Sequence, residues 1–291
     1  MSLRSFLKKI SRILPDKLYL QLKFYQRVGK WPNLEDPQTF NEKIQWLKLY
    51  DRKPIYTTLV DKYEVKKYVA DIIGEEHIIP TLGVWDHFDD SDFDTLPAQF
   101  VLKCTHDSGG LVIVRDKAQL DIAAARTKLI SRMKNNYYWH GREWPYKYVK
   151  PRIIAEKFIE DPGKVVPEDY KVYCINEKPH YIVVFHNRFN DNEVLSETVY
   201  DTDWVPQHIS LDEHFEISDI IEPRPKCLEE LLCLAKKLCQ GMSQARIDFY
   251  IVDSQIYFGE ITLYTANGFQ KMIPEEIDEN LGALIDLSIV Q

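Results

Sequence analysis

A pair of glycines stands between two apolar, β-branched runs in the stretch Phe-Val-Leu-Lys-Cys-Thr-His-Asp-Ser-Gly-Gly-Leu-Val-Ile-Val, from Phe100 to Val114. The phosphate-binding loop of nucleotide hydrolases needs Lys and Ser or Thr directly after its glycines, followed by a helix. Here Gly109 and Gly110 are followed by Leu-Val-Ile-Val, which favours extended chain. The stretch therefore predicts two strands joined by a glycine loop, with Lys103 on the first. Such a loop can cover phosphate with its backbone N–H groups or be a plain surface hairpin, and these residues leave both open.

Lysine and arginine are concentrated at the N-terminus of a chain whose net charge is −8. That overall charge argues against a general nucleic-acid-binding protein, because such proteins need basic surface. Residues 1–30 nevertheless contain eight Lys or Arg and one acid, Asp16, and the apolar residues from Leu3 to Leu14 recur at helical spacing. The segment predicts a basic amphipathic helix that is too short and too charged to cross a membrane. It can lie on an anionic lipid surface or dock on the rest of the protein, and both alternatives stay open.

The cysteines and histidines bear on the compartment and on metal binding. The five cysteines form no Cys-x-x-Cys pair, and the eight histidines are scattered without metal-ligand spacing. This pattern is typical of free thiols in a reducing compartment and gives no sign of a zinc site. We therefore expect a cytoplasmic protein, with residues 1–30 as the candidate contact to the inner face of a membrane.

Helical and extended patterns alternate along the chain, as is typical of an α+β protein. Helical periodicity covers residues 38–72, with a break at Pro54 and an end at Gly74, while residues 86–94 and 136–148 predict loops, the second of them over a site. The remaining predictions are helices at residues 120–134 and 227–239, the latter closed by Gly241, and extended segments at 78–84, 152–159, 170–175, 180–185, 194–200 and 245–263.

The last predicted hairpin brings two carboxylates together. A three-residue loop at residues 253–255 predicts these cross-strand pairs: Val252 with Ile256, Asp248 with Glu260, and Arg246 with Thr262. Paired carboxylates repel unless a cation lies between them, and hard oxygen ligands of this kind suit Mg²⁺. The alternative is a solvated hairpin face with Arg246 as its counter-ion.

Two other stretches contain the residue types of a nucleotide site. In Ile153–Asp161 an apolar strand runs into Glu-Lys-Phe-Ile, whose backbone can face a purine edge while Phe158 and Ile159 pack near the ring. Farther along, Asp169 and Lys171 alternate on one face of a strand. One can hold a ribose hydroxyl and the other a phosphate.

In chain order, these motifs are a strand lysine with a glycine loop, Glu-Lys-Phe-Ile, Asp-Tyr-Lys-Val, and Asp followed by Glu-x-Thr. The series resembles the ATP-grasp fold from about Asp61 to the end of the chain. More narrowly, several blocks resemble the TupA-like ATP-grasp proteins of surface-polysaccharide gene clusters: residues 36–43, 60–63, 102–110, 152–157, 200–204 and 258–262. The resemblance implies two α+β subdomains that grip ATP, at residues 91–160 and 161–291, preceded by a helical region at residues 1–90.

The resemblance also implies roles for individual residues. Lys62 and Lys103 would contact the α- and β-phosphates, the glycine loop would cover them, and the segment after Ala155 would line adenine. Asp169 would contact the ribose. The full nucleotide set is Lys62, Lys103, His106, Ser108, Gly109, Gly110, Glu156, Lys157, Phe158, Ile159 and Asp169. The catalytic set that meets the transferred phosphoryl group is Lys171, Arg188 and Arg246. The metal set is Asp248, Glu260 and Thr262.

Two residues bear on how complete this site is. Thr262 stands where many ATP-grasp enzymes have Asn, and its hydroxyl is the weaker metal ligand, which puts a second metal position in doubt. Asp107 brings a negative charge next to the expected phosphates unless its side chain points away into solvent.

The implied activity is that of a carboxylate–amine ligase that uses ATP and Mg²⁺, forms an acyl phosphate and joins small-molecule or glycan substrates in surface polysaccharide biosynthesis. Two rivals remain: a glycosyltransferase that binds metal through Asp201 and Asp203, and a non-catalytic nucleotide-binding protein. The glycosyltransferase leaves Lys103 and Glu156 without a role. A protein kinase has the least support of the alternatives, because neither His-Arg-Asp nor Asp-Phe-Gly occurs.

Overall fold

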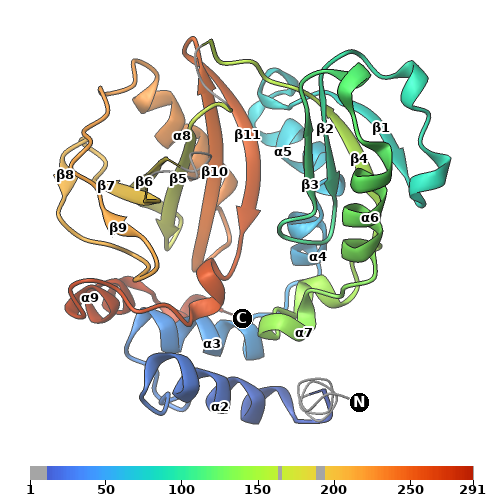
Figure 1. Cartoon of the computed structure of the whole chain (residues 1–291). Coiled ribbons are helices and arrows are strands. Elements are labelled where there is room, and N and C mark those ends of the chain that lie inside the picture. Colours follow the sequence, from blue (N-terminus) through green and yellow to red (C-terminus); the bar gives the residue numbers. More distant parts are fainter. Residues whose placement is uncertain (1–11, 163–165, 188–193, 291) are drawn as a thin grey trace.

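The computed structural model describes residues 12–162, 166–187 and 194–290. Its strands are β1 (Thr81–Trp85), β2 (Phe100–Cys104), β3 (Leu111–Val114), β4 (Ile153–Lys157), β5 (Asp169–Ile175), β6 (Lys178–His186), β7 (Ser196–Tyr200), β8 (Pro206–Gln207), β9 (Glu216–Ile217), β10 (Gln244–Val252) and β11 (Gln255–Thr262). They form two sheets that stand side by side in Figure 1. The smaller has the strand order β1-β4-β2-β3, and the larger has the order β11-β10-β5-β6-β7-β8 with β9 paired to β7.

Helices surround both sheets. The α-helices are α2 (Asp16–Val28), α3 (Phe40–Tyr50), α4 (Ile55–Val60), α5 (Glu64–Ile73), α6 (Ile122–Met133), α7 (Tyr138–Gly141), α8 (Leu228–Leu238) and α9 (Glu276–Leu284). The 3₁₀ helices are η1 (Glu75–His77), η2 (Phe88–Asp90), η3 (Phe93–Thr95), η4 (Lys117–Gln119), η5 (Trp144–Lys147), η6 (Thr265–Gly268) and η7 (Leu287–Ile289). In the part of the chain that the structure describes, none of the helices is both long and apolar enough to cross a bilayer. Most of the basic helix predicted for residues 1–14 lies outside the described residues.

Capping residues set the helix ends where the sequence predicts them. Thr39 and Glu42 form a reciprocal capping box at the start of α3. The Asp121 side chain accepts the N–H of Ala124 at 2.9 Å and starts α6. Gly74, with φ of 107°, ends α5, and Gly241, with φ of 76°, follows α8 in the left-handed region that glycine favours.

Two main hydrophobic cores support the two sheets. In the larger core, buried residues of β5, β6, β10 and β11 pack with the apolar faces of α3, α4, α5 and α8. In the smaller core, β2 and β4 pack against Ala125 and Leu129 of α6. Each sheet therefore has one face covered by helices, and the strand residues of opposite alternation are available to line a site.

The structure differs from the sequence-based expectation in the placing of β1 and in residues 136–148. The extended segment predicted at residues 78–84 corresponds to β1, which lies within the predicted helical region at residues 1–90 yet pairs with β4 in the smaller sheet. Residues 136–148 form α7 and η5 instead of an irregular loop. The reason is burial, because Tyr138 and Trp144 join the larger core and the Arg142 side chain is fully enclosed, with its guanidinium 4.3 Å from the centre of the Tyr19 ring.

Candidate functional site

A cavity of about 460 Å³ is lined by residues of β2, β3 and β4 of the smaller sheet and of β5, β6 and β10 of the larger. Its apolar lining includes Ile79, Val101, Leu111, Ile113 and Phe185. Six residues of the predicted nucleotide set also line it: Lys103, Glu156, Lys157, Phe158, Ile159 and Asp169. An apolar cavity with a few polar groups is the usual form of a small-molecule site.

The chain leaves the smaller sheet at the wall of this cavity. Lys157, the last residue of β4, donates its N–H to the carbonyl oxygen of Pro80 at 2.9 Å. Phe158 and Ile159 follow beyond the strand, and the Arg115 guanidinium lies 5.7 Å from the centre of the Phe158 ring. The contact between a purine edge and backbone groups that the sequence predicts for this segment stays a prediction.

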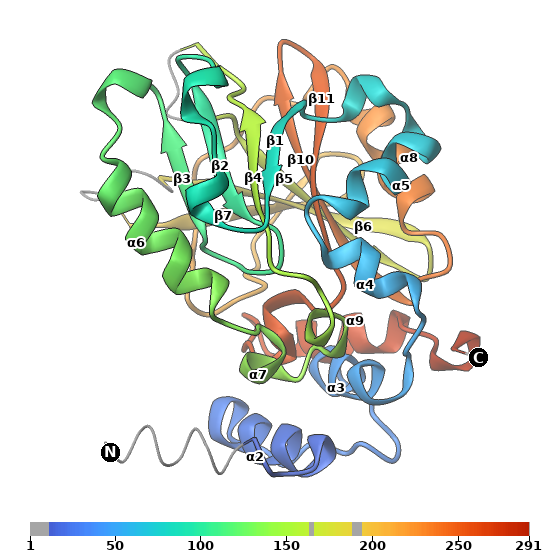
Figure 2. The same ribbon diagram turned by 90° about the vertical axis from the view of Figure 1, so that its right-hand side faces the viewer.

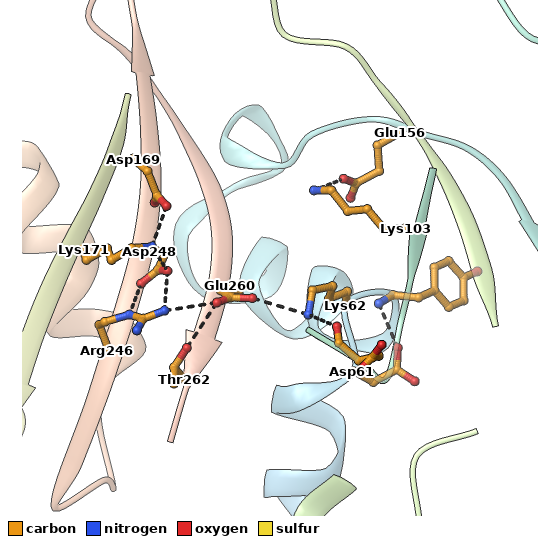
Figure 3. Close-up of polar contacts among 12 residues, drawn as sticks. Asp61, Lys62, Lys103, Glu156, Asp169, Lys171, Arg246, Asp248, Glu260 and Thr262 are labelled. Carbon is orange, nitrogen blue, oxygen red and sulfur yellow. Dashed lines mark hydrogen bonds and ion pairs between the residues drawn. The ribbon is translucent and has the colours of Figure 1, made fainter. Parts of the chain in front are cut away.

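Glu156 is held between two lysines. Its carboxylate oxygens lie 2.5 Å from the Nζ of Lys103 and 2.5 Å from the Nζ of Lys66 (Figure 3 shows the Lys103 contact). Burial alone would raise the pKa of Glu156, but the two ammonium groups hold it below its usual value. Glu156 is therefore ionised, and it fixes the Lys103 side chain at the cavity wall.

Replacing Lys103 with Met tests whether this lysine contacts phosphate. Because Glu156 keeps its pair with Lys66, the protein should stay folded, while Mg-ATP binding should weaken by roughly 2 kcal/mol, about thirtyfold, the scale of a lost charge-assisted contact. Calorimetric titration of the variant with Mg-ATP measures this. Lys67→Met, at a lysine whose side chain is 83% exposed on α5, is the matched control. If the folded Lys103→Met variant bound Mg-ATP with unchanged affinity, the interpretation of the glycine loop as a plain hairpin would be favoured.

A row of alternating charges runs across β5, β10 and β11 and on to Lys62 (Figure 3). Lys171 Nζ lies 2.5 Å from Asp169 Oδ2 and 2.6 Å from Asp248 Oδ2. Arg246 donates to both oxygens of Asp248, at 2.6 and 2.7 Å, and to Glu260 Oε1 at 3.2 Å. Glu260 Oε2 lies 3.4 Å from Lys62 Nζ, and Thr262 Oγ1 donates to Glu260 Oε1 at 3.3 Å. The predicted catalytic and metal residues within the described chain therefore form one connected group.

Two of the three cross-strand pairs predicted for this hairpin are observed, although the predicted loop length was wrong. The hairpin turn has two residues, Asp253 and Ser254, both with positive φ, so Val252 pairs with Gln255 instead of Ile256. A bulge between Asp248 and Phe249 then shifts the register by one residue. The extra residue is Gly259, where a Cβ would lie 3.0 Å from the Asp248 carbonyl oxygen. The bulge restores the predicted pairs of Asp248 with Glu260 and Arg246 with Thr262.

Lys62 connects this row to the glycine loop. It lies between α4 and α5, and its Nζ donates to the carbonyl oxygen of Asp107 at 3.1 Å while its backbone N–H donates to Thr105 at 3.0 Å. Ser108 and Gly109 are exposed at the tip of the loop, and Gly109 has φ of 92°. Gly110 is buried, and a Cβ there would lie 2.9 Å from Cys104. Both glycines are thus required by the local geometry.

Asp107 and His106 lie under the loop and not on the cavity wall. The Asp107 carboxylate is buried and faces Arg132 at 3.5 Å, so it points into the protein and not into solvent, one of the two positions left open by the sequence. His106 is also buried, with its Nε2 3.1 Å from the carbonyl oxygen of Asn135, and burial lowers its pKa. We therefore leave His106 out of the proposed nucleotide contacts.

The carboxylates of the row fit a magnesium ion that arrives with phosphate. No group of three His, Cys, Asp or Glu side chains that could hold a metal occurs in residues 12–162, 166–187 and 194–290. Mg²⁺ needs only one or two carboxylates when water and substrate phosphates complete its shell. Partial burial would raise the pKa of Glu260, but Lys62 and Arg246 hold it below its usual value. Glu260 is therefore ionised, with 36% of its side chain exposed, and with Asp248 and the Thr262 hydroxyl it offers a set of hard oxygens.

Some residues of the candidate site were missed, and one predicted residue is not described. Lys66 follows Lys62 by four residues, and this spacing, which is that of one helical turn, could have indicated that Lys66 lies near Lys62. Tyr250 lies two residues after Asp248 on β10 and lines the cavity. Arg188, predicted to meet the transferred phosphoryl group, lies outside the described residues.

A family model described as TupA-like ATPgrasp matches residues 42–286 of the chain. The match includes the glycine loop, the charged row and the segment after β4. No curated protein matches the sequence.

Several solved structures are similar to this chain. The D-alanine–D-alanine ligase from Bacillus anthracis, crystallised with ATP, has 16% identity and a TM-score of 0.47, over 80% of this chain and 65% of that one. The D-alanine–D-alanine ligase from Helicobacter pylori has 13% identity and a TM-score of 0.44, over 86% and 67% of the two chains. An N5-carboxyaminoimidazole ribonucleotide synthetase in complex with ADP has 15% identity and a TM-score of 0.45, over 82% and 58%. The chain thus spans 65% of the length of the first of these proteins.

Proposed function

The chain belongs to the TupA-like ATP-grasp family, and from this membership we propose that it is an ATP- and Mg²⁺-dependent carboxylate–amine ligase that releases ADP and phosphate. The observation that carries the proposal is the charged row, in which Lys62, Lys171 and Arg246 surround the carboxylates of Asp248 and Glu260.

The proposed reaction has two steps. An oxygen of the substrate carboxylate attacks the γ-phosphorus of ATP, the bond to the bridging oxygen breaks, and ADP leaves with that electron pair. The amine nitrogen then attacks the carbonyl carbon of the acyl phosphate, loses a proton, and expels phosphate to leave an amide. Negative charge develops on oxygen in both steps, so catalysis depends on cations placed beforehand.

The row supplies such cations in fixed positions. Lys171 and Arg246 are held by Asp248, and Lys62 is held by Glu260 and the glycine loop. Little reorganisation is then needed when charge develops, which is the main source of electrostatic catalysis. Asp248, Glu260 and Thr262 would hold Mg²⁺, which supplies further charge neutralisation at the phosphate oxygens.

The nucleotide would occupy the cavity between the sheets. Adenine would lie against the apolar lining near Phe158 and Ile159, the ribose near Asp169, and the phosphates near Lys103, all of which line the cavity. The glycine loop, which is not part of that lining, would cover the phosphates. We further propose that the substrates belong to surface polysaccharide biosynthesis, with a sugar acid and an amino compound joined by the amide. That part rests on the family resemblance alone.

The glycosyltransferase alternative has less support. Asp201 accepts the N–H groups of Asp203 and Val205, at 3.0 and 2.9 Å, through one oxygen, and the amide of Gln207 at 3.1 Å through the other. These bonds stabilise the turn between β7 and β8. Asp201 therefore has a structural role in this turn, whereas the glycosyltransferase leaves the paired Lys103 and Glu156 without a role.

Positional isotope exchange tests the ligase directly. With Mg²⁺ and the correct carboxylate but no amine, reversible formation of the acyl phosphate should move the β–γ bridging oxygen label of ATP into non-bridging positions, as read by phosphorus NMR. Lys171→Met and Arg246→Met should each suppress this exchange more than they weaken ATP binding, because both cations face the reacting group. Candidate uronic and amino acids serve as the carboxylates. Release of AMP and pyrophosphate, or turnover of a sugar nucleotide without ATP, would contradict the proposal.

A further inference from the structure

The helix α2 has apolar residues on two faces. Leu20 and Phe24 are buried, and the Phe24 ring packs edge-on against Phe269 with centres 6.4 Å apart. On the outward face, an outer stripe is exposed to solvent: Leu18 (42% exposed), Leu22 (43%), Tyr25 (49%) and, just after the helix, Trp31 (57%). Spacings of four and three residues put the first three side chains on one face. Docking on the rest of the protein thus accounts for only one of the two faces.

Tyr25 and Trp31 make the end of the outer stripe aromatic. Gly29 ends α2 with φ of 86°, and the chain turns so that Trp31 stacks on Tyr25 with ring centres 5.1 Å apart and an angle of 21° between the planes. Tyrosine and tryptophan have apolar bodies and polar tips, which favour the boundary between water and lipid headgroups.

Cations lie at both ends of the outer stripe. Arg12 and Lys17 lie near its start, and Arg27 and Lys30 near its end. Lys17 pairs with Glu35, and Lys30 lies 3.4 Å from Glu275, but these pairs are exposed and so contribute little. Residues 1–30 carry a net charge of +7 in a chain of −8, so the remainder carries −15. The positive charge is therefore concentrated in the N-terminal part of the sequence, which contains α2.

We propose that the outer stripe of α2 docks this protein on the surface of an anionic lipid bilayer, with the helix lying in the plane of the membrane. The leucines and aromatic rings would enter the headgroup region while the flanking cations meet lipid phosphates and carboxylates. A second copy of the chain is a poorer occupant, because two such stripes would bring like charges together. Figures 1 and 2 show α2 beyond α3, at the end of the molecule away from the smaller sheet, so docking leaves the nucleotide cavity free.

Co-sedimentation of the full-length protein with vesicles tests this proposal. Vesicles of phosphatidylcholine and phosphatidylserine in equal parts should bind the wild type at low salt, and vesicles of phosphatidylcholine alone should not. Leu18→Ser/Leu22→Ser should lower the partition coefficient at least about tenfold, because two leucines no longer enter the apolar region. Arg27→Gln/Lys30→Gln should lower it also, with a weaker dependence on salt. Ile122→Ser/Leu284→Ser, at similarly exposed residues of α6 and α9, is the matched control and should bind like the wild type.

Thermal unfolding and Mg-ATP binding establish that each variant is folded. The proposal is overturned if the wild type fails to bind anionic vesicles, if it binds neutral vesicles equally well, or if the folded leucine variant binds as before. It is also overturned if sedimentation velocity shows a dimer that the leucine variant abolishes, since a second copy would then cover the stripe. If the leucine variant unfolds, the charge variant decides, because Arg27 and Lys30 are exposed.

Discussion

Asp248→Asn and Glu260→Gln are each expected to lower ligase turnover by at least roughly a thousandfold, the scale of several kcal/mol of lost charge stabilisation. Each change removes one negative charge and almost no volume. For Asp248 it also leaves Arg246 and Lys171 without the carboxylate that holds them at 2.6 to 2.7 Å. Raising the Mg²⁺ concentration should partly rescue Glu260→Gln, because Glu260 is partly exposed and pairs less tightly with Arg246, at 3.2 Å.

The control for this pair is Asp201→Asn, which removes a carboxylate charge from the turn after β7 and should keep turnover. ADP release under saturating ATP measures all three variants, and circular dichroism establishes their folding. The metal assignment is wrong if both site variants turn over normally. If Asp201→Asn abolishes ADP release and Asp248→Asn does not, the metal assignment is likewise wrong.

Gly282→Ala is expected to destabilise the folded protein by roughly 3 kcal/mol, through overpacking. Gly282 lies in α9, and a Cβ there would be 2.2 Å from the carbonyl oxygen of Gln38 and 2.6 Å from the backbone nitrogen of Phe40. Both contacts are with backbone at the start of α3, which no change of rotamer can relieve.

The sign of the change in the free energy of unfolding tests whether α3 and α9 are in close contact. At an open position in a helix, alanine is more favourable than glycine by about 1 kcal/mol, so the same substitution would stabilise the protein if α3 and α9 were not in close contact. Chemical denaturation monitored by tryptophan fluorescence gives the free energy of unfolding. Ala283→Ser, one residue along and exposed, should change it by no more than about 0.5 kcal/mol.

Local patterns were enough to predict most elements and the polar face of the site. The β-branched runs on either side of Gly109 and Gly110 do form β2 and β3, and strict alternation puts Arg246 and Asp248 on the same face of the sheet, opposite Thr262 and Glu260 of β11. Alternation is a local property, so it can be read from the sequence alone. The break at Pro54 and the ends at Gly74 and Gly241 were predicted for the same reason.

The predictions that were wrong or missing concern features that depend on contacts between distant parts of the chain. Lys66 gains its importance from Glu156, ninety positions away, and no local pattern reports such a partner. Residues 136–148 look polar and aromatic enough for a loop, but Tyr138 and Trp144 are buried in the larger core, where Trp144 packs near Tyr56 of α4. The hairpin at Asp253 was given one residue too many, and only the compensating bulge at Gly259 kept the predicted carboxylate pair.

The charged row also determines how the site would distinguish among anions. Its three cations, Lys62, Lys171 and Arg246, and its three carboxylates, Asp169, Asp248 and Glu260, sum to zero charge. A simple oxyanion such as sulfate can bind a lysine or the arginine of the row only by separating an ion pair. It brings no cation to pair with the carboxylate that is left. Mg-ATP brings both, a divalent ion for the carboxylates and phosphate oxygens for the lysines and the arginine. The site would therefore bind the magnesium complex of a nucleotide in preference to a free anion. Abundant phosphate in the surrounding solution would then compete poorly with the nucleotide.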